Sequence, residues 1–195
     1  MSVMGDVMLI KKQLSLVTIC VMVIMLTTAL AAGSSELKDM LASNDPEQQL
    51  SALEQVQDEH IREAIPAVIP LLGSLHQDVR QTAAAVLQSF GPDCLPLFQK
   101  ALEDRETNNE LTRLELVRLC GKIGSEQAVP LLVIALSDPD VSVRRGAILT
   151  LEQIGFDKQN VLDAISIGIH DPNQQIRQVT ANALQRVPTG LLLQS

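Results

Sequence analysis

Four arginines recur along the sequence at nearly constant spacing and are the first residues whose chemistry could define a site. They follow one another at intervals of 33, 31 and 33 residues, as Arg80, Arg113, Arg144 and Arg177. An aspartate stands six places earlier in two copies, so that Asp138 precedes Arg144 and Asp171 precedes Arg177. The other two copies carry a hydroxyl residue there, Ser74 and Thr107. Because a partly buried ion pair positions elements more readily than it reacts, we interpret these residues as structural.

Other residue types show no pattern typical of a catalytic or metal site. His60, His76 and His170 are widely separated, whereas a metal site needs several converging ligands. The sequence contains no Gly-x-Ser-x-Gly elbow and no glycine-rich phosphate loop, and its acidic residues are scattered. We therefore predict no catalytic residue, no metal and no cofactor, and hence that the chain is not an enzyme.

Two cysteines, Cys94 and Cys120, lie beyond the N-terminal apolar segment. Cys120 stands seven residues after its arginine, where other copies have Leu87 and Leu151. We expect it to be a small buried hydrophobic residue. A Cys94–Cys120 disulfide, formed in an oxidising compartment, is the alternative.

The composition favours thin layers of stacked helices. Apolar residues make up 46% of the 195 residues, but aromatic residues only 2%, with no Trp and no Tyr. A fold built around one centre usually fills it with large aromatic side chains. The net charge is −8, and no basic cluster follows Lys12. Nucleic-acid binding, which relies on neutralising phosphates, is therefore excluded from the expected functions.

The first 32 residues have the pattern of a signal peptide. Lys11 and Lys12 precede an apolar run, and Ala29 and Ala31 supply the small residues at the −3 and −1 places before a cleavage site. This pattern predicts an exported protein, periplasmic or extracellular. The alternative is an inner-membrane anchor formed by residues 14–32, which are barely long enough to span a bilayer. Membrane contact is expected only through this segment, and residues 33–44 are expected to form a linker or capping helix.

Beyond residue 44 the sequence repeats as pairs of helices. Asp-Pro pairs, with Asp as the N-cap and Pro in the first turn, are expected to open first helices at Asp45, Asp138 and Asp171. Glycines are expected to end them, and prolines to start the second helices. The domain spans 45–195, with copies at 45–73, 74–104, 105–137, 138–170 and 171–195.

This arrangement of Asp-Pro, arginine, apolar stripe and glycine resembles HEAT repeats, especially the short bacterial, phycobilisome-lyase-like kind. The resemblance covers almost all of the chain after the signal segment. It implies an all-α, right-handed α-solenoid of about four and a half helix pairs, with a ladder of Asp and Arg between neighbouring repeats. Diiron HEAT-like hydroxylases use repeated His-Glu pairs, but this chain has only Glu59-His60, in reverse order.

In solenoids of this type the second helices line the concave face, where charged residues are expected. Here apolar residues predominate at these places, which predicts a surface that binds a protein or peptide. The candidates are Ala67, Pro70, Lys100, Leu131, Ile134, Ala164 and Ile167. The alternative is that they belong to the core. The predicted function is a scaffold at the cell envelope, and the alternative is an accessory subunit similar to HEAT-type bilin lyases.

Overall fold

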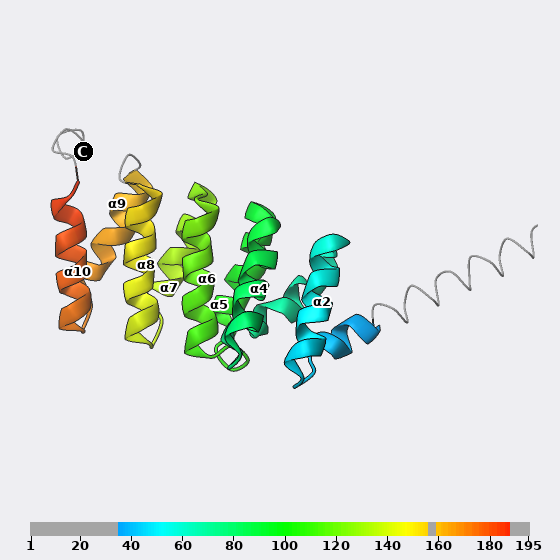
Figure 1. The fold of residues 1–195 in the computed structure, drawn as a ribbon. Coiled ribbons are helices and arrows are strands. Elements are labelled where there is room, and N and C mark those ends of the chain that lie inside the picture. The colour runs from blue at the N-terminus through cyan, green and yellow to red at the C-terminus, as the bar shows by residue number, and fades with distance from the viewer. Residues whose placement is uncertain (1–34, 156–158, 188–195) are drawn as a thin grey trace, which may run out of the picture.

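The computed structural model describes residues 35–155 and 159–187, and every regular element among them is helical. After a short helix over residues 35–41, pairs of helices stack side by side into an elongated array (Figure 1). The expected all-α solenoid is confirmed. The predicted signal or anchor segment, residues 1–32, lies outside the described residues, and within them no helix is long and apolar enough to cross a membrane.

The first helix of each pair belongs to one row, the first-helix layer (Figure 1). Its members are α2 (Pro46–Asp58), α4 (Gln77–Ser89), α6 (Glu110–Ile123), α8 (Val141–Ile154) and α10 (Gln174–Gln185). The repeat boundaries proposed from the sequence stay a prediction.

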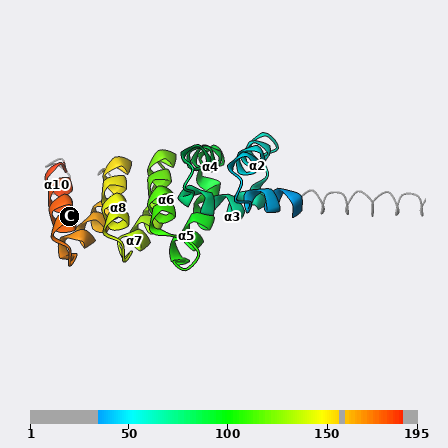
Figure 2. The same cartoon turned by 60° about the horizontal axis from the view of Figure 1, so that its bottom comes forward.

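The second helices form a parallel row behind it, the second-helix layer, and the two rows separate clearly when the array is turned (Figure 2). These helices are shorter and joined to 3₁₀ turns: η1 (Arg62–Ala64), α3 (Ile65–Val68), η2 (Ile69–Gly73), η3 (Gly91–Cys94), α5 (Leu95–Glu103), η4 (Glu126–Ala128), α7 (Val129–Ala135), α9 (Gln159–Ser166) and η5 (Ile167–His170). Prolines stand in the first turns of α3, α5 and α7, as predicted.

The start of each first helix follows the local sequence, with one correction. Asp45 is the N-cap of α2, and its carboxylate accepts a hydrogen bond from the Glu47 N–H at 3.0 Å. The prediction of Asp138 and Asp171 as N-caps is wrong, because α8 and α10 begin two residues later and are capped by Asp140 and Asn173. The two displaced carboxylates accept hydrogen bonds from these capping residues' N–H groups and also bind arginines, as described below.

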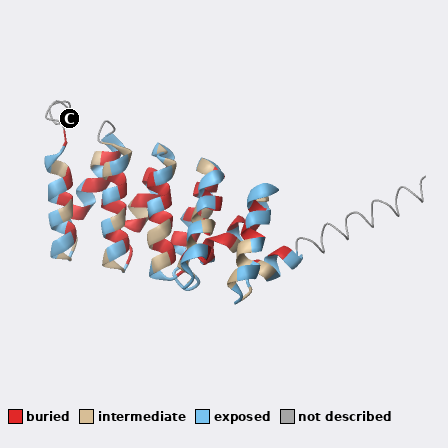
Figure 3. Cartoon of the chain, viewed as in Figure 1, coloured by how far each residue is buried: buried red, intermediate tan, exposed pale blue. Residues whose placement is uncertain are grey.

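The core lies between the two layers and runs along the whole array (Figure 3). It is built mainly from Leu, Val, Ile and Ala, as the low aromatic content predicted, and Phe98 is its largest fully buried side chain. Cys94 and Cys120 are both buried free thiols, so the alternative of a disulfide between them is wrong. Cys120 has the buried position that its place in the repeat predicted.

Candidate functional site

The recurring arginines form ion pairs from one repeat to the next. The Arg113 side chain donates from Nε to Asp138 Oδ2 at 2.7 Å and from Nη2 to Asp138 Oδ1 at 3.0 Å. Arg144 binds Asp171 in the same two-pronged way, at 2.7 and 3.1 Å. Each aspartate therefore pairs with the arginine of the preceding repeat, and not with the arginine six residues later in its own repeat.

Within its own repeat, each arginine binds backbone instead. Arg144 Nη1 donates to the Asp138 carbonyl at 2.8 Å, and Arg177 Nη1 donates to the Asp171 carbonyl at 2.8 Å. The corresponding bond of Arg80, to the Ser74 carbonyl, is 2.7 Å long. One edge of the guanidinium thus fixes the loop before the helix, and the Nε–Nη2 edge remains for a neighbour.

The ion pairs shift the pKa values of Arg113, Arg144 and Asp171. The hydrogen bonds that Arg113 and Arg144 donate to the Asp138 and Asp171 carboxylates raise the pKa values of these arginines, although burial opposes this effect. Burial alone would raise the pKa of Asp171, but hydrogen bonds from the Arg144 guanidinium and the Asn173 N–H outweigh it and lower that pKa. These pairs join neighbouring repeats, which agrees with a structural role.

The seven surface candidates of the second-helix layer divide into two rows. In the first row Leu131 and Ala164 are only 4% and 2% exposed, so the interpretation of these two as surface residues is wrong, and Ala67 is half-buried. They pack between neighbouring second helices and complete the core. The second row does reach the surface, with Pro70, Lys100, Ile134 and Ile167 exposed or half-buried.

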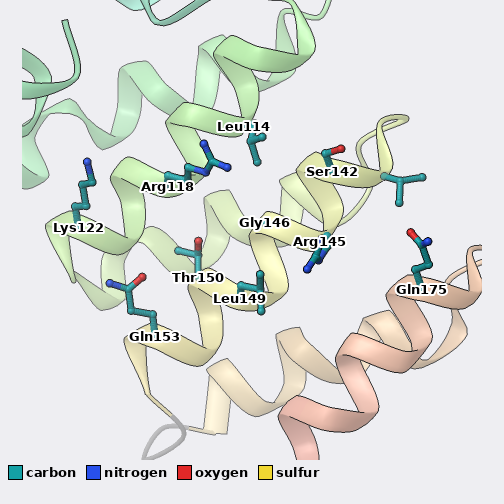
Figure 4. A pocket seen from close by; sticks show the side chains of 11 residues that line it. Leu114, Arg118, Lys122, Ser142, Arg145, Gly146, Leu149, Thr150, Gln153 and Gln175 are labelled. Carbon is teal, nitrogen blue, oxygen red and sulfur yellow. The ribbon is translucent and has the colours of Figure 1, made fainter. Parts of the chain in front are cut away.

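A groove lies on the first-helix layer, between α6 and α8, and extends toward α10 (Figure 4). It encloses about 660 Å³. Gly146 forms part of its floor, and a Cβ atom there would lie 2.9 Å from Leu114 Cδ1, so the missing side chain lets α8 approach α6 closely. Leu114, Val141 and Leu149 give it apolar walls, and Leu149 is 44% exposed.

Three basic side chains line this α6–α8 groove. Arg118 and Lys122 come from successive turns of α6, and Arg145 comes from α8 (Figure 4). Arg118 forms an ion pair with Glu115 on its own helix. Lys122 and Arg145 have no acidic partner within the described ranges. In a chain of net charge −8, this local positive charge is suited to a carboxylate-bearing ligand.

Analysis of the sequence missed this groove. The relevant signal was the concentration of basic residues on two first helices, at Arg118, Lys122, Arg144 and Arg145. Of these four residues, the sequence analysis singled out only Arg144, because it recurs. In the structure Arg144 binds Asp171 in the ladder, whereas Arg145 lines the groove.

The histidines do not come together. His60, in the turn after α2, stacks on Phe90 with ring centroids 4.3 Å apart, and His76 is the N-cap of α4. Among the described residues there is no group of three or more His, Cys, Asp or Glu side chains that could hold a metal ion.

Comparison with known proteins identifies the repeats. Residues 95–185 match the family model described as HEAT repeats. The expected HEAT repeats are therefore confirmed, whereas nothing bears out the phycobilisome-lyase-like detail. No curated protein sequence matches the chain significantly.

Among solved structures, the chain is similar to human deoxyhypusine hydroxylase in complex with glycerol, with 20% identity and a TM-score of 0.49. The match covers 76% of this chain, which spans 60% of the length of that structure. This comparison contradicts the prediction that the chain is not an enzyme, because the matched protein is one, and the prediction is not maintained. The match assigns no activity to this chain.

Proposed function

We propose that this chain, whose residues 95–185 match HEAT repeats, is a protein-binding scaffold at the cell envelope, and that its partner presents an acidic segment to the α6–α8 groove. The observation that carries the proposal is the groove itself, with its three basic side chains in an acidic protein. Burial of Leu131 and Ala164 removes much of the apolar surface expected on the second-helix layer, which favours the first-helix layer.

The chemistry of the groove defines the kind of segment that fits it. Leu114 and Leu149 offer apolar contact, so the segment needs at least one apolar side chain. Lys122 and Arg145 stand on opposite helices, so acidic residues on both sides of that apolar side chain would each meet a cation. Such charge pairs at an interface contribute mainly to specificity and to the association rate.

The location and the excluded partners follow from sequence features. The N-terminal pattern of residues 1–32 supports an exported protein, periplasmic or extracellular, and the alternative keeps it at the inner membrane through residues 14–32. Nucleic acid is not the proposed ligand, because three basic residues in a chain of net charge −8 cannot neutralise a run of phosphates. The bilin-lyase-like alternative stays a prediction.

The test uses charge reversal in the groove. A variant carrying Lys122→Glu and Arg145→Glu is compared with one carrying Lys38→Glu and Lys100→Glu, two exposed residues outside the groove. The probe is a fluorescein-labelled peptide of alternating Glu and Leu, followed by anisotropy, with the matching Lys-Leu peptide as a second probe. Both variants have the same net charge, so general repulsion of the acidic probe is the same for both.

We expect the wild type and the control variant to bind the acidic peptide with similar affinity, and the groove variant to bind it at least about tenfold more weakly, as loss of a few charge contacts implies. Binding by the wild type should weaken as salt increases. Equal loss in both double variants, or equal affinity of the wild type for the two probe peptides, would refute the groove as the binding site.

A further inference from the structure

One arginine of the ladder, Arg80, forms no ion pair with an aspartate of the described residues. The residue that pairs with a preceding arginine occupies a fixed place, two residues before the N-cap of a first helix. Asp138 and Asp171 hold this place before Asp140 and Asn173, and their carboxylates accept hydrogen bonds from these N–H groups at 2.9 and 2.8 Å. Before α6, whose N-cap is Asn109, the same place is held by Thr107.

Arg80 is nonetheless oriented by its backbone in the same way as the paired arginines. Its Nη1 donates to the Ser74 carbonyl at 2.7 Å and to the Leu75 carbonyl at 3.0 Å. In Arg144, the equivalent bonds to the Asp138 and Pro139 carbonyls are 2.8 and 3.0 Å long. The same edge of the guanidinium is therefore held in both, which leaves the Nε–Nη2 edge of Arg80 for an acceptor.

No acceptor for that edge is found in the part of the chain that the structure describes. Thr107 has no carboxylate to offer, and its N–H donates back to Asp104 Oδ1 at 3.1 Å. Arg80 is half-buried and lines an open groove, so a group from outside the chain can reach its Nε–Nη2 edge. A guanidinium edge fixed in advance is well suited to a carboxylate, which it binds with two parallel hydrogen bonds.

Arg80 also lies beside the proposed binding surface. It lines a second groove, of about 400 Å³, between α4 and α6, together with Gln77, Gln81 and Lys122. The one carboxylate in this lining, that of Glu115, forms an ion pair with Arg118. Lys122 lines both this groove and the α6–α8 groove, so the two grooves are neighbours on the first-helix layer. A partner segment that crosses α6 can therefore reach Arg80.

We propose that Arg80 is a receptor for an Asp or Glu side chain of the partner protein, which completes the ladder in place of the missing aspartate. The inference rests on the proposed function for the identity of its ligand. The partner's carboxylate takes the position relative to Arg80 that Asp138 takes relative to Arg113. The segment thus binds basic residues on α4, α6 and α8.

The most direct test supplies Arg80 with a carboxylate from within the chain. Thr107→Asp places a carboxylate at the position, two residues before an N-cap, that Asp138 and Asp171 hold in later repeats, and Thr107→Asn is the matched uncharged control. We expect Thr107→Asp to raise the midpoint of thermal unfolding and to weaken binding of the Glu-Leu peptide about tenfold or more, because it occupies Arg80. Thr107→Asn should change binding little. Arg80→Lys keeps the charge but loses the two-pronged edge, and should weaken binding with folding intact.

Three results would overturn the proposal. One is a Thr107→Asp variant that is more stable than the wild type but binds the peptide equally well. Another is a Thr107→Asp variant changed in neither property, since Arg80 would then not recognise a carboxylate at that place. The third is free succinate bound as tightly as the peptide in an Arg80-dependent manner, which would identify a receptor for small anions.

The same peptide separates this proposal from the proposed function. If the Lys122→Glu and Arg145→Glu variant loses binding while Thr107→Asp and Arg80→Lys do not, the groove is supported and the Arg80 receptor fails. If Thr107→Asp and Arg80→Lys weaken binding and the groove variant does not, the receptor is supported and the α6–α8 groove is wrong as the main site.

Discussion

The ion pair between Arg113 and Asp138 should be a principal contribution to the joint between two repeats, and Asp138→Asn tests it. The substitution keeps the size of the side chain and an oxygen that accepts from the Asp140 N–H. It removes the negative charge and the acceptor of the 2.7 Å bond from Arg113 Nε. Both side chains are buried, so Arg113 would keep its charge with only the Asn108 carbonyl and one amide oxygen as acceptors.

The expected cost follows from these contacts. Removing one partner of a buried ion pair costs about 3–5 kcal/mol, because a charge is left uncompensated. The lower end, about 3 kcal/mol, applies here since one acceptor survives. For a chain of this size it corresponds to a fall of roughly 6–12 °C in the unfolding midpoint. Urea unfolding followed by circular dichroism at 222 nm measures the change directly.

The matched control is Asp163→Asn, the same chemical change at an exposed residue whose neutral partner is Gln159. It should alter stability by less than about 0.5 kcal/mol. A second variant, Arg113→Met with Asp138→Asn, removes both charges and should be more stable than Asp138→Asn alone. A cost below about 1 kcal/mol for Asp138→Asn, or a double variant less stable than the single one, would refute this account of the ladder.

Three further outcomes follow from packing and titration. Gly168→Ala should destabilise the protein by about 1–3 kcal/mol, since a Cβ there would overlap Thr180 Oγ1 and lie 2.9 Å from Ile148 Cδ1, and urea unfolding measures the loss. The pKa of Asp171 is lowered from its ordinary 3.8, so the stability it contributes is present above that pH and is lost as the pH falls below it. Asp171→Asn should accordingly reduce the fall in unfolding midpoint between pH 5 and pH 3. Burial raises the pKa values of the Cys94 and Cys120 thiols to about 11 and about 12, so neither should react with Ellman's reagent at pH 8 until urea unfolds the protein.

Much of the fold could be predicted from the sequence because its signals are local. Gly124 and Gly155 end α6 and α8 with positive φ, where a glycine costs least, and this was predicted from their place after each apolar stripe. The prolines that open α3, α5 and α7 were equally visible. These features need only the residues next to them.

The faces of the second helices could not be predicted in the same way. Leu131 and Ala164 were assigned to the surface on the assumption of continuous α-helical periodicity. The second helices are only 4–9 residues long and adjoin 3₁₀ turns such as η4 and η5. A 3₁₀ turn has 3.0 residues instead of 3.6, so each one shifts the phase of the helix beside it. Over one or two turns, the sequence pattern cannot determine which residues face inward.

Which aspartate each arginine binds could not be predicted either, for a different reason. In sequence, Arg144 stands six residues from Asp138 and 27 residues from Asp171. The resemblance to HEAT repeats implies a ladder between neighbouring repeats, but the spacing alone does not tell which aspartate each arginine binds. The structure divides the guanidinium between both, with Nη1 on the Asp138 carbonyl and the Nε–Nη2 edge on the Asp171 carboxylate. Only the stacking of neighbouring repeats brings that carboxylate within reach, and stacking is not encoded at any fixed distance along the chain.

The joints between neighbouring repeats differ along the array. Between the later repeats the joints carry buried charge pairs, Arg113 with Asp138 and Arg144 with Asp171. In the first repeat Gln49 replaces the arginine and binds the Ser43 carbonyl at 2.6 Å, so the first joint needs no acidic partner. Arg80 lies at the second joint, between the first joint and the charged later joints. Among the described residues, no aspartate forms an ion pair with it. The acceptors that the described residues offer Arg80 are backbone carbonyls, so a carboxylate of the proposed partner would stabilise the second joint more than either of its neighbours.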